Sequence, residues 1–155
     1  MPKFETTRIV GHSAEQMFAL VADVESYPQF VPLCQRLSVR GREKQPDGTE
    51  ILIADMSVAY GPVNETFVTR VVLDPANLMI EATYLDGPFS HLDNQWRFSN
   101  QETGEAGNTS AVHFKIDYEF KSRTLSMLMG SMFDRAFRKF AEAFEARADA
   151  VYHMS

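Results

Sequence analysis

The side chains that most often perform catalysis occur in this chain, but their spacing does not assemble a familiar reactive site. The histidines, His12, His91, His113 and His153, are scattered, and none stands at metal-ligand spacing from a cysteine or carboxylate. The single cysteine, Cys34, has no obvious partner base, and no serine occurs in the Gly-x-Ser-x-Gly pattern of hydrolases. We therefore expect no metal site, no catalytic residue and no catalytic cofactor.

Two carboxylates in strand-like sequence leave one route to chemistry open. Asp55 and Asp93 could act as general acid or base if their side chains pointed into the interior of the protein. A half-buried carboxylate that is hydrogen-bonded to a neighbouring strand is the alternative interpretation, and the one that the sequence favours.

Apolar residues that suit a pocket are abundant toward the C-terminus. The chain holds twelve Phe and eight Met, which are adaptable fillers of cores and of pockets for apolar ligands. Gly130 interrupts a helical stripe of such residues at a cost of about 1 kcal/mol relative to alanine, so volume is missing beside side chains that can re-pack. The stripe predicts either a plain core or a cavity wall. Its predicted ligand contacts are Met129, Met132, Phe133 and Phe137.

A proline-rich apolar segment near the N-terminus is the second candidate for ligand contact. The prolines stiffen residues 27–34 and so lower the entropy lost when a ligand orders them. The segment is predicted to form either the rim of a pocket, where it could touch a membrane, or a plug at one end of the core. Its predicted contacts are Tyr27, Phe30, Val31, Pro32 and Leu33, and Phe89, which follows a Gly-Pro turn, is expected at the pocket mouth.

One concentrated positive strip is predicted on an acidic chain of net charge −6. Arg36, Arg40, Arg42 and Lys44 share one face of a strand if side chains alternate regularly. Such a strip could meet anionic phospholipid headgroups, where each cation is worth about 1 kcal/mol, or ribosomal RNA. A merely solvated outer face is the third interpretation.

The elements that must position these residues follow from periodicity. Residues 3–10 predict a strand, Ser13 and Gln16 have capping-box spacing for a helix, and a second short helix must end before Pro28. Spacings of three and four predict one long C-terminal helix that reaches Tyr152. The polar stretch 101–108 predicts a surface loop. Alternating apolar and polar residues predict six further strands at 36–44, 50–60, 63–73, 78–85, 92–98 and 112–120.

These elements predict a single α+β domain over residues 1–155. Short connections between strands favour an antiparallel sheet, and a long apolar helix needs a long concave surface to cover its stripe. We expect a curved sheet of about seven strands wrapped around the C-terminal helix, with two short helices after the first strand. The chain lacks a signal-peptide pattern and an apolar run of membrane-spanning length. A cytoplasmic protein is therefore expected, with peripheral contact to the inner membrane left open.

The order of elements and three stretches of sequence resemble the START-like superfamily, also called polyketide cyclase/dehydrase, whose fold is the helix-grip. The stretches are Tyr27–Cys34, Leu85–Phe89 with Leu92 and Trp96, and Phe114–Phe120. They are similar to a subfamily of coenzyme Q-binding proteins and bacterial ribosome association toxins. At Leu33 the eukaryotic relatives typically carry tryptophan and many bacterial ones glycine, and this chain has neither.

The resemblance implies a hydrophobic tunnel between sheet and helix that holds ubiquinone, another isoprenoid quinone or a similar lipid without altering it. Such a protein would support respiratory electron transport or quinone delivery. A ribosome-binding protein that inhibits subunit association is one alternative, and a cyclase-like enzyme using Asp55 or Asp93 is another; DNA is not an expected partner. The sheet residues implied to face the ligand are Met56, Trp96, Phe114, Ile116 and Tyr118.

Overall fold

The computed structural model describes residues 3–60, 63–100 and 109–152. The predicted loop 101–108 and His153 lie outside these ranges. Within them the helices are α1 (Ala14–Ala22), the 3-10 helix η1 (Val24–Gln29), α2 (Arg123–Arg138) and α3 (Phe140–Val151). The strands are β1 (Lys3–Val10), β2 (Cys34–Lys44), β3 (Glu50–Tyr60), β4 (Val63–Asp74), β5 (Met79–Asp86), β6 (Phe89–Asn100) and β7 (Ser110–Phe120).

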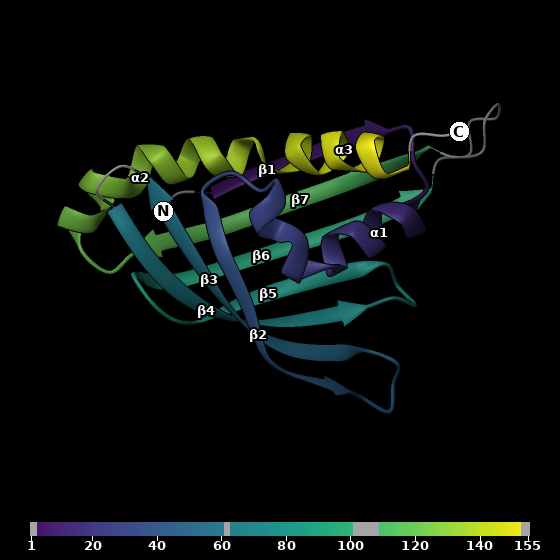
Figure 1. The fold of residues 1–155 in the computed structure, drawn as a ribbon, viewed down its shortest axis with the longest axis horizontal. Coiled ribbons are helices and arrows are strands. Elements are labelled where there is room, and N and C mark those ends of the chain that lie inside the picture. Colours follow the sequence, from purple (N-terminus) through teal and green to yellow (C-terminus); the bar gives the residue numbers. More distant parts are fainter. Residues whose placement is uncertain (1–2, 61–62, 101–108, 153–155) are drawn as a thin grey trace.

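The strands form one curved antiparallel sheet, as expected, in the order β1-β7-β6-β5-β4-β3-β2. Neighbours in the chain are neighbours in the sheet from β2 to β7, and each pair is antiparallel. β1 pairs with β7 instead, at the far edge. The helices α2 and α3 lie across the concave face, and α1 and η1 cover one end (Figure 1).

The first helix begins as its sequence predicts. The hydroxyl of Ser13 accepts a hydrogen bond from the Gln16 backbone N–H at 3.1 Å, and the Gln16 side-chain oxygen accepts one from the Ser13 N–H at 3.0 Å. The prediction that the next helix ends before Pro28 is wrong, because η1 runs through this proline to Gln29. The helix tolerates the N–H that Pro28 lacks. The N–H groups of Phe30 and Val31, which follow the proline, both donate to the carbonyl of Tyr27, which precedes it.

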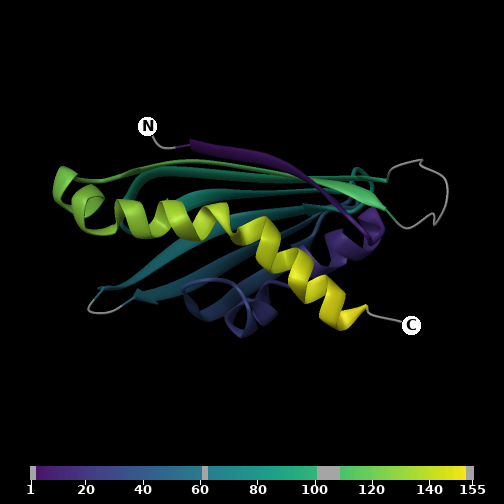
Figure 2. The same ribbon diagram turned by 90° about the horizontal axis from the view of Figure 1, so that it is seen from above.

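The C-terminal helix is not continuous, which corrects the prediction of one long helix. It divides at Lys139 into α2 and α3, where the Lys139 N–H bonds to the carbonyls of both Ala136 and Phe137. The shorter bonds tighten the turn and bend the axis, so that the two segments follow the curve of the sheet (Figure 2). Among the described residues, no helix has the length and apolar character needed to cross a membrane.

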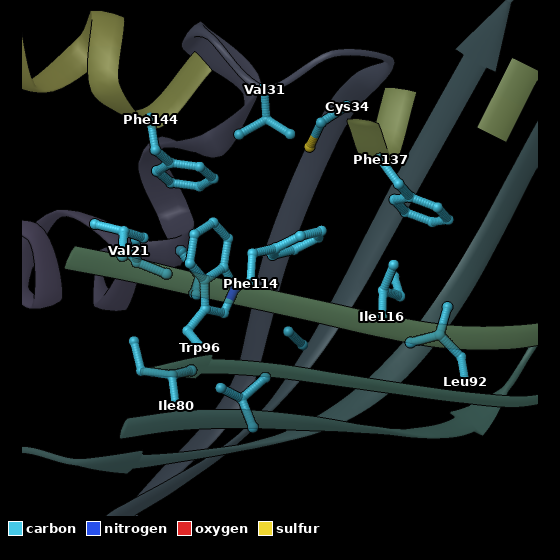
Figure 3. Packing of buried hydrophobic residues seen from close by; sticks show 14 of the residues in the cluster. Val21, Val31, Cys34, Ile80, Leu92, Trp96, Phe114, Ile116, Phe137 and Phe144 are labelled. Carbon is cyan, nitrogen blue, oxygen red and sulfur yellow. The ribbon is translucent and has the colours of Figure 1, made fainter. Parts of the chain in front are cut away.

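The core lies between the concave face of the sheet and the two C-terminal helices. Phe144 of α3 and Phe137 of α2 point toward the sheet, above Trp96 and Ile116 (Figure 3). The indole of Trp96 lies 4.7 Å from the Phe114 ring and 5.0 Å from the Phe144 ring, measured between centroids. Edge-to-face contacts of this kind add to the gain from apolar burial, so helix and sheet are joined mainly through aromatic rings.

Substitution of Gly130 tests whether the structure needs the space that its absent side chain leaves. A Cβ atom built at this position meets only the Ser126 hydroxyl oxygen, at 3.7 Å, so nothing obstructs a methyl group. We expect Gly130→Ala to raise the free energy of unfolding by about 0.5–1 kcal/mol, because glycine is costly inside a helix. Urea-induced unfolding followed by circular dichroism measures the change.

Gly87→Ala is the matched control, with the opposite expected sign. Gly87 has φ +140°, and a Cβ there would lie 2.6 Å from the Cβ of Phe67, which must then shift. We expect a loss of at least about 1 kcal/mol. A Gly130→Ala protein less stable than the wild type would mean that the backbone at Gly130 needs glycine for another reason.

Candidate apolar cavity

A partly open apolar cavity of about 80 Å³ lies between the concave face of the sheet and the helices. All strands from β2 to β7 contribute to its wall, and the helices close it from above. The helical side chains that line it are Val24, Tyr27, Phe137, Phe140 and Phe144. The sheet side chains are Leu37, Ala54, Met56, Phe67, Thr69, Val71, Ile80, Ala82, Leu92, Asn94, Trp96 and Ile116.

Five residues that the sequence singled out meet at this cavity. Tyr27 comes from η1, Met56 from β3, Trp96 from β6, Ile116 from β7 and Phe137 from α2. They are brought together because strand alternation turns the three sheet residues to the concave face while the helices deliver the other two. Phe140 and Phe144 complete the wall and were not singled out, although they continue the same helical stripe.

Other predicted contacts are buried in aromatic packing outside the cavity wall. Phe89, which was expected at the pocket mouth, is fully buried at the opposite end of the sheet from α1. Its ring stacks on Phe120 at 4.9 Å and meets Phe133 edge-on at 5.6 Å. Tyr118 packs edge-on against Phe137 at 5.0 Å. Phe114 and Met129 are likewise buried and do not line the cavity.

The residues of the predicted rim segment, 27–34, lie in two different environments. Phe30 packs edge-on against Phe144 at 5.0 Å, and Val31 is buried, so both belong to the core beneath the loop. Pro32 and Leu33 line a separate surface hollow together with Met132 of α2. Leu33 has φ +69°, a left-handed backbone conformation that is costly for a leucine.

Two polar side chains interrupt the apolar wall, Thr69 and Asn94. The Asn94 amide nitrogen donates to the Lys115 carbonyl at 2.9 Å. An amide group carries two N–H donors and a carbonyl acceptor, so this bond orients the side chain and leaves one N–H and the oxygen for a ligand. Sequence alternation had marked Asn94 as the exception on an apolar face, but only the structure places it in a cavity wall.

The tyrosines of this region remain neutral. Burial is the main cause that raises the pKa of Tyr27 far above its usual range, and the Tyr27 hydroxyl donates to the Val21 carbonyl. Burial also raises the pKa of Tyr118 to about 12. No carboxylate or histidine lines the cavity in the part of the chain that the structure describes. The cavity therefore offers an uncharged apolar surface with one orienting amide and one hydroxyl.

The two carboxylates considered for chemistry point away from the cavity. Asp55 lies on the outer face of the sheet, where its carboxylate accepts from Arg40 Nε at 3.0 Å. Asp93 is exposed on the same face, in a polar hollow that Lys115 also lines. The inward orientation that the enzyme hypothesis needs is therefore wrong for both. Within residues 3–60, 63–100 and 109–152, no three His, Cys, Asp or Glu side chains are placed to hold a metal ion.

The predicted basic strip is split between the two faces of β2, which corrects its expected single face. A β-bulge between Val39 and Gly41 shifts the register, so Arg40 leaves the regular alternation. Arg36 pairs opposite the outer-face residue Ser57, whereas Arg42 and Lys44 follow the concave side. The Arg42 guanidinium pairs with Glu25 of η1 at 3.2 Å and with Glu50 at 3.8 Å; Lys44 lies opposite Glu50.

Comparison with known proteins gives full-length similarities. The family described as polyketide cyclase/dehydrase and lipid transport matches residues 10–145. The mitochondrial coenzyme Q-binding protein COQ10 homolog B of Xenopus laevis is 33% identical over 151 residues, which cover 97% of this chain and 59% of that protein. The ribosome association toxin RatA of Escherichia coli K12 is 34% identical over 152 residues, which cover 98% of this chain and 90% of that protein. This chain thus spans less than two thirds of the Xenopus protein.

A solved structure has the same arrangement of elements. The Zhui aromatase/cyclase from Streptomyces sp. R1128 superimposes with a TM-score of 0.79 over 98% of this chain and 96% of that chain. Sequence identity is 16%, so the likeness concerns the fold alone. It supports the curved seven-stranded sheet closed by C-terminal helices.

Cys34, at the start of β2, gives a measurable test of the packing beneath the loop. Burial raises the pKa of its thiol from 9.0 to about 11, so the reactive thiolate is about 100-fold rarer at pH 8 than in the unfolded chain. We expect native protein to react with iodoacetamide at least about 100-fold more slowly than urea-unfolded protein, and faster as the pH rises toward 11. Mass spectrometry of timed samples measures both rates, and equal rates would contradict the packing.

Proposed function

Because this chain belongs to the polyketide cyclase/dehydrase and lipid transport family, we propose that it is a non-catalytic protein that binds an apolar ligand, preferentially a lipid-soluble quinone, in the cavity between sheet and helices. The observation that carries this proposal is the cavity itself, a partly open apolar space in which one oriented amide interrupts the hydrocarbon wall. Pockets for small molecules commonly combine apolar walls with a few polar groups that fix the ligand's orientation.

The size of the cavity sets a condition on the ligand. An apolar cavity of about 150 Å³ binds benzene, so a space of about 80 Å³ must widen slightly before it admits a substituted ring. Met56 is the wall residue best able to re-pack, because methionine has three flexible side-chain bonds. A long isoprenoid tail exceeds this volume, so the tail either displaces the covering helix or stays outside.

Asn94 gives a reason for a quinone over a plain hydrocarbon. A quinone carbonyl accepts hydrogen bonds, and Asn94 retains one N–H after bonding to Lys115. The reduced ring carries hydroxyl groups, which can donate to the Asn94 oxygen instead. The name of the Xenopus relative, a coenzyme Q-binding protein, supports the same ligand class.

Binding to a ribosome, with inhibition of subunit association, is the alternative, and the E. coli relative named a ribosome association toxin supports it. The alternative cannot use the β2 strip as one surface, because the bulge divides Arg36 and Arg40 from Arg42 and Lys44. Sedimentation with purified ribosomal subunits tests it independently of the cavity.

The single tryptophan, Trp96, lies in the cavity wall and reports directly on occupancy. We expect a short-tailed ubiquinone to quench its fluorescence in a saturable titration, because the quinone ring must approach the indole. Ala54→Leu should weaken this binding at least about tenfold, since the larger side chain fills the space. Fluorescence titration of both proteins measures the effect.

Ala146→Leu is the matched control, because Ala146 lies exposed on α3 and should leave quenching unchanged. A thermal melt shows that both variants fold. If wild-type protein gave no saturable quenching, or if Ala54→Leu bound as well as wild type, the cavity would not be the quinone site.

Replacing the orienting amide separates quinone recognition from apolar burial. We expect Asn94→Leu to lower quinone affinity about five- to tenfold, which corresponds to one lost hydrogen bond. Binding of an alkylbenzene of similar size should remain equal or improve. Equal losses for both ligands would show that the substitution acts through packing and not through the hydrogen bond.

A further inference from the structure

The segment from Lys121 to Lys139, which contains α2, has a charge opposite to the rest of the chain. It carries five cations, Lys121, Arg123, Arg135, Arg138 and Lys139, against one acid, Asp134, for a net charge of +4. The whole chain has a net charge of −6, so the remainder carries −10. A basic amphipathic helix on an acidic protein is typical of contact with an anionic surface.

The same helix also exposes two large apolar side chains, while its phenylalanines are buried. Met127 is 79% exposed and Leu128 is 66% exposed, the highest values among the large apolar residues that the structure describes. They stand next to one another in the first turns of α2. Both views place these turns at one end of the molecule, away from α1 and the C-terminus (Figures 1 and 2). Two large apolar side chains in one turn of the helix therefore stand open to a partner.

Apolar and basic residues share one side of α2. Leu128, Met132, Arg135 and Lys139 recur at spacings of four, three and four, so they follow one stripe along the helix. The stripe borders a surface hollow of about 260 Å³, which the Pro32–Leu33 loop closes from the other side. The loop is fastened to β3, since the Ala59 N–H donates to the Leu33 carbonyl at 3.1 Å.

The cations on this stripe are not neutralised by the protein. Neither Arg135 nor Lys139 forms an ion pair within the described ranges, while Arg138 pairs with Asp134 at 3.0 Å and Arg40 with Asp55 at 3.0 Å. The β2 arginine Arg42 is also paired. Arg135 and Lys139 therefore both keep their positive charge available to an anionic partner.

We propose that this surface, called the α2 face and formed by Met127, Leu128, Arg135 and Lys139 with Pro32 and Leu33, docks the protein on an anionic phospholipid bilayer. The apolar pair enters the headgroup boundary, and the two cations meet lipid phosphates. RNA fits this face less well, because a phosphate backbone gains nothing from the exposed Met127 and Leu128 side chains, whereas a bilayer does.

Docking does not depend on the cavity ligand, but it would place the membrane against one of the helices that cover the cavity. Phe137 of α2 lines the cavity, while Arg135 and Lys139 of the same helix lie on the α2 face. An apolar molecule leaving the bilayer would therefore meet the cavity cover first.

Vesicle co-sedimentation of the full chain tests the proposal. We expect wild-type protein to bind vesicles of phosphatidylcholine with about one third phosphatidylglycerol, to ignore pure phosphatidylcholine, and to release in high salt. Met127→Ser with Leu128→Ser, and separately Arg135→Gln with Lys139→Gln, should each lower the partition coefficient more than tenfold, since each cation alone accounts for about fivefold.

Matched controls carry the same chemical changes at other exposed positions. Arg36→Gln with Arg40→Gln, and Leu85→Ser, should bind vesicles as wild type does. Thermal melts and the Trp96 quinone titration show that every variant is folded, and they report on the cavity separately. Absence of binding to anionic vesicles, equal loss in the controls, or charge-dependent binding to ribosomal RNA without vesicle binding would each overturn the proposal.

Discussion

The structure depends on covering the concave face of one curved sheet. Seven strands with alternating side chains create a long apolar hollow surface that water must leave, and a straight helix cannot follow its curvature. The break at Lys139 solves this geometric problem, since α2 and α3 each lie against their own part of the sheet. Aromatic rings of helix and sheet pack together around most of the core, and Phe137, Phe140 and Phe144, which each contact a ring of the sheet, also border the space that remains as the cavity.

The two halves of this cover are held in different ways. Polar contacts fasten α3 to the N-terminal elements: Glu145 pairs with Arg8, Asp149 with His12 at 2.7 Å, and the Tyr152 hydroxyl donates to the Gln16 carbonyl. No hydrogen bond from an α2 side chain to another element is found in the described ranges; Arg138 lies over the Phe4 ring at 4.8 Å. Apolar contacts lack direction, so α2 can shift over the cavity at lower cost than α3.

This asymmetry unites the proposed functions of the cavity and of the α2 face. A cavity of about 80 Å³ needs movement before a substituted ring enters, and the helix with fewer polar ties is also the one with unpaired cations and exposed Met127 and Leu128. A bilayer that attracts α2 would act on the segment most able to uncover the cavity. The two carboxylates considered for chemistry, Asp55 and Asp93, lie on the outer face of the sheet and not beside the cavity.

The sequence by itself determined the elements and the fold class. Alternation located every strand within three residues of its observed bounds, the Ser13–Gln16 capping box placed the start of α1, and the family resemblance in Tyr27–Cys34 and its companion stretches is confirmed. These features were predictable because period-two alternation and helix capping are local properties of the chain.

Only the tertiary structure decided how those elements face one another. The bulge at Arg40 moved half of the basic strip to the other face, because one extra residue reverses strand alternation. Five of the predicted ligand residues met at the cavity, while Phe89 and Met129, of the same residue types, went into solid packing. Which apolar side chain borders empty space depends on the distance between helix and sheet, and that distance is set by all the side chains between them together.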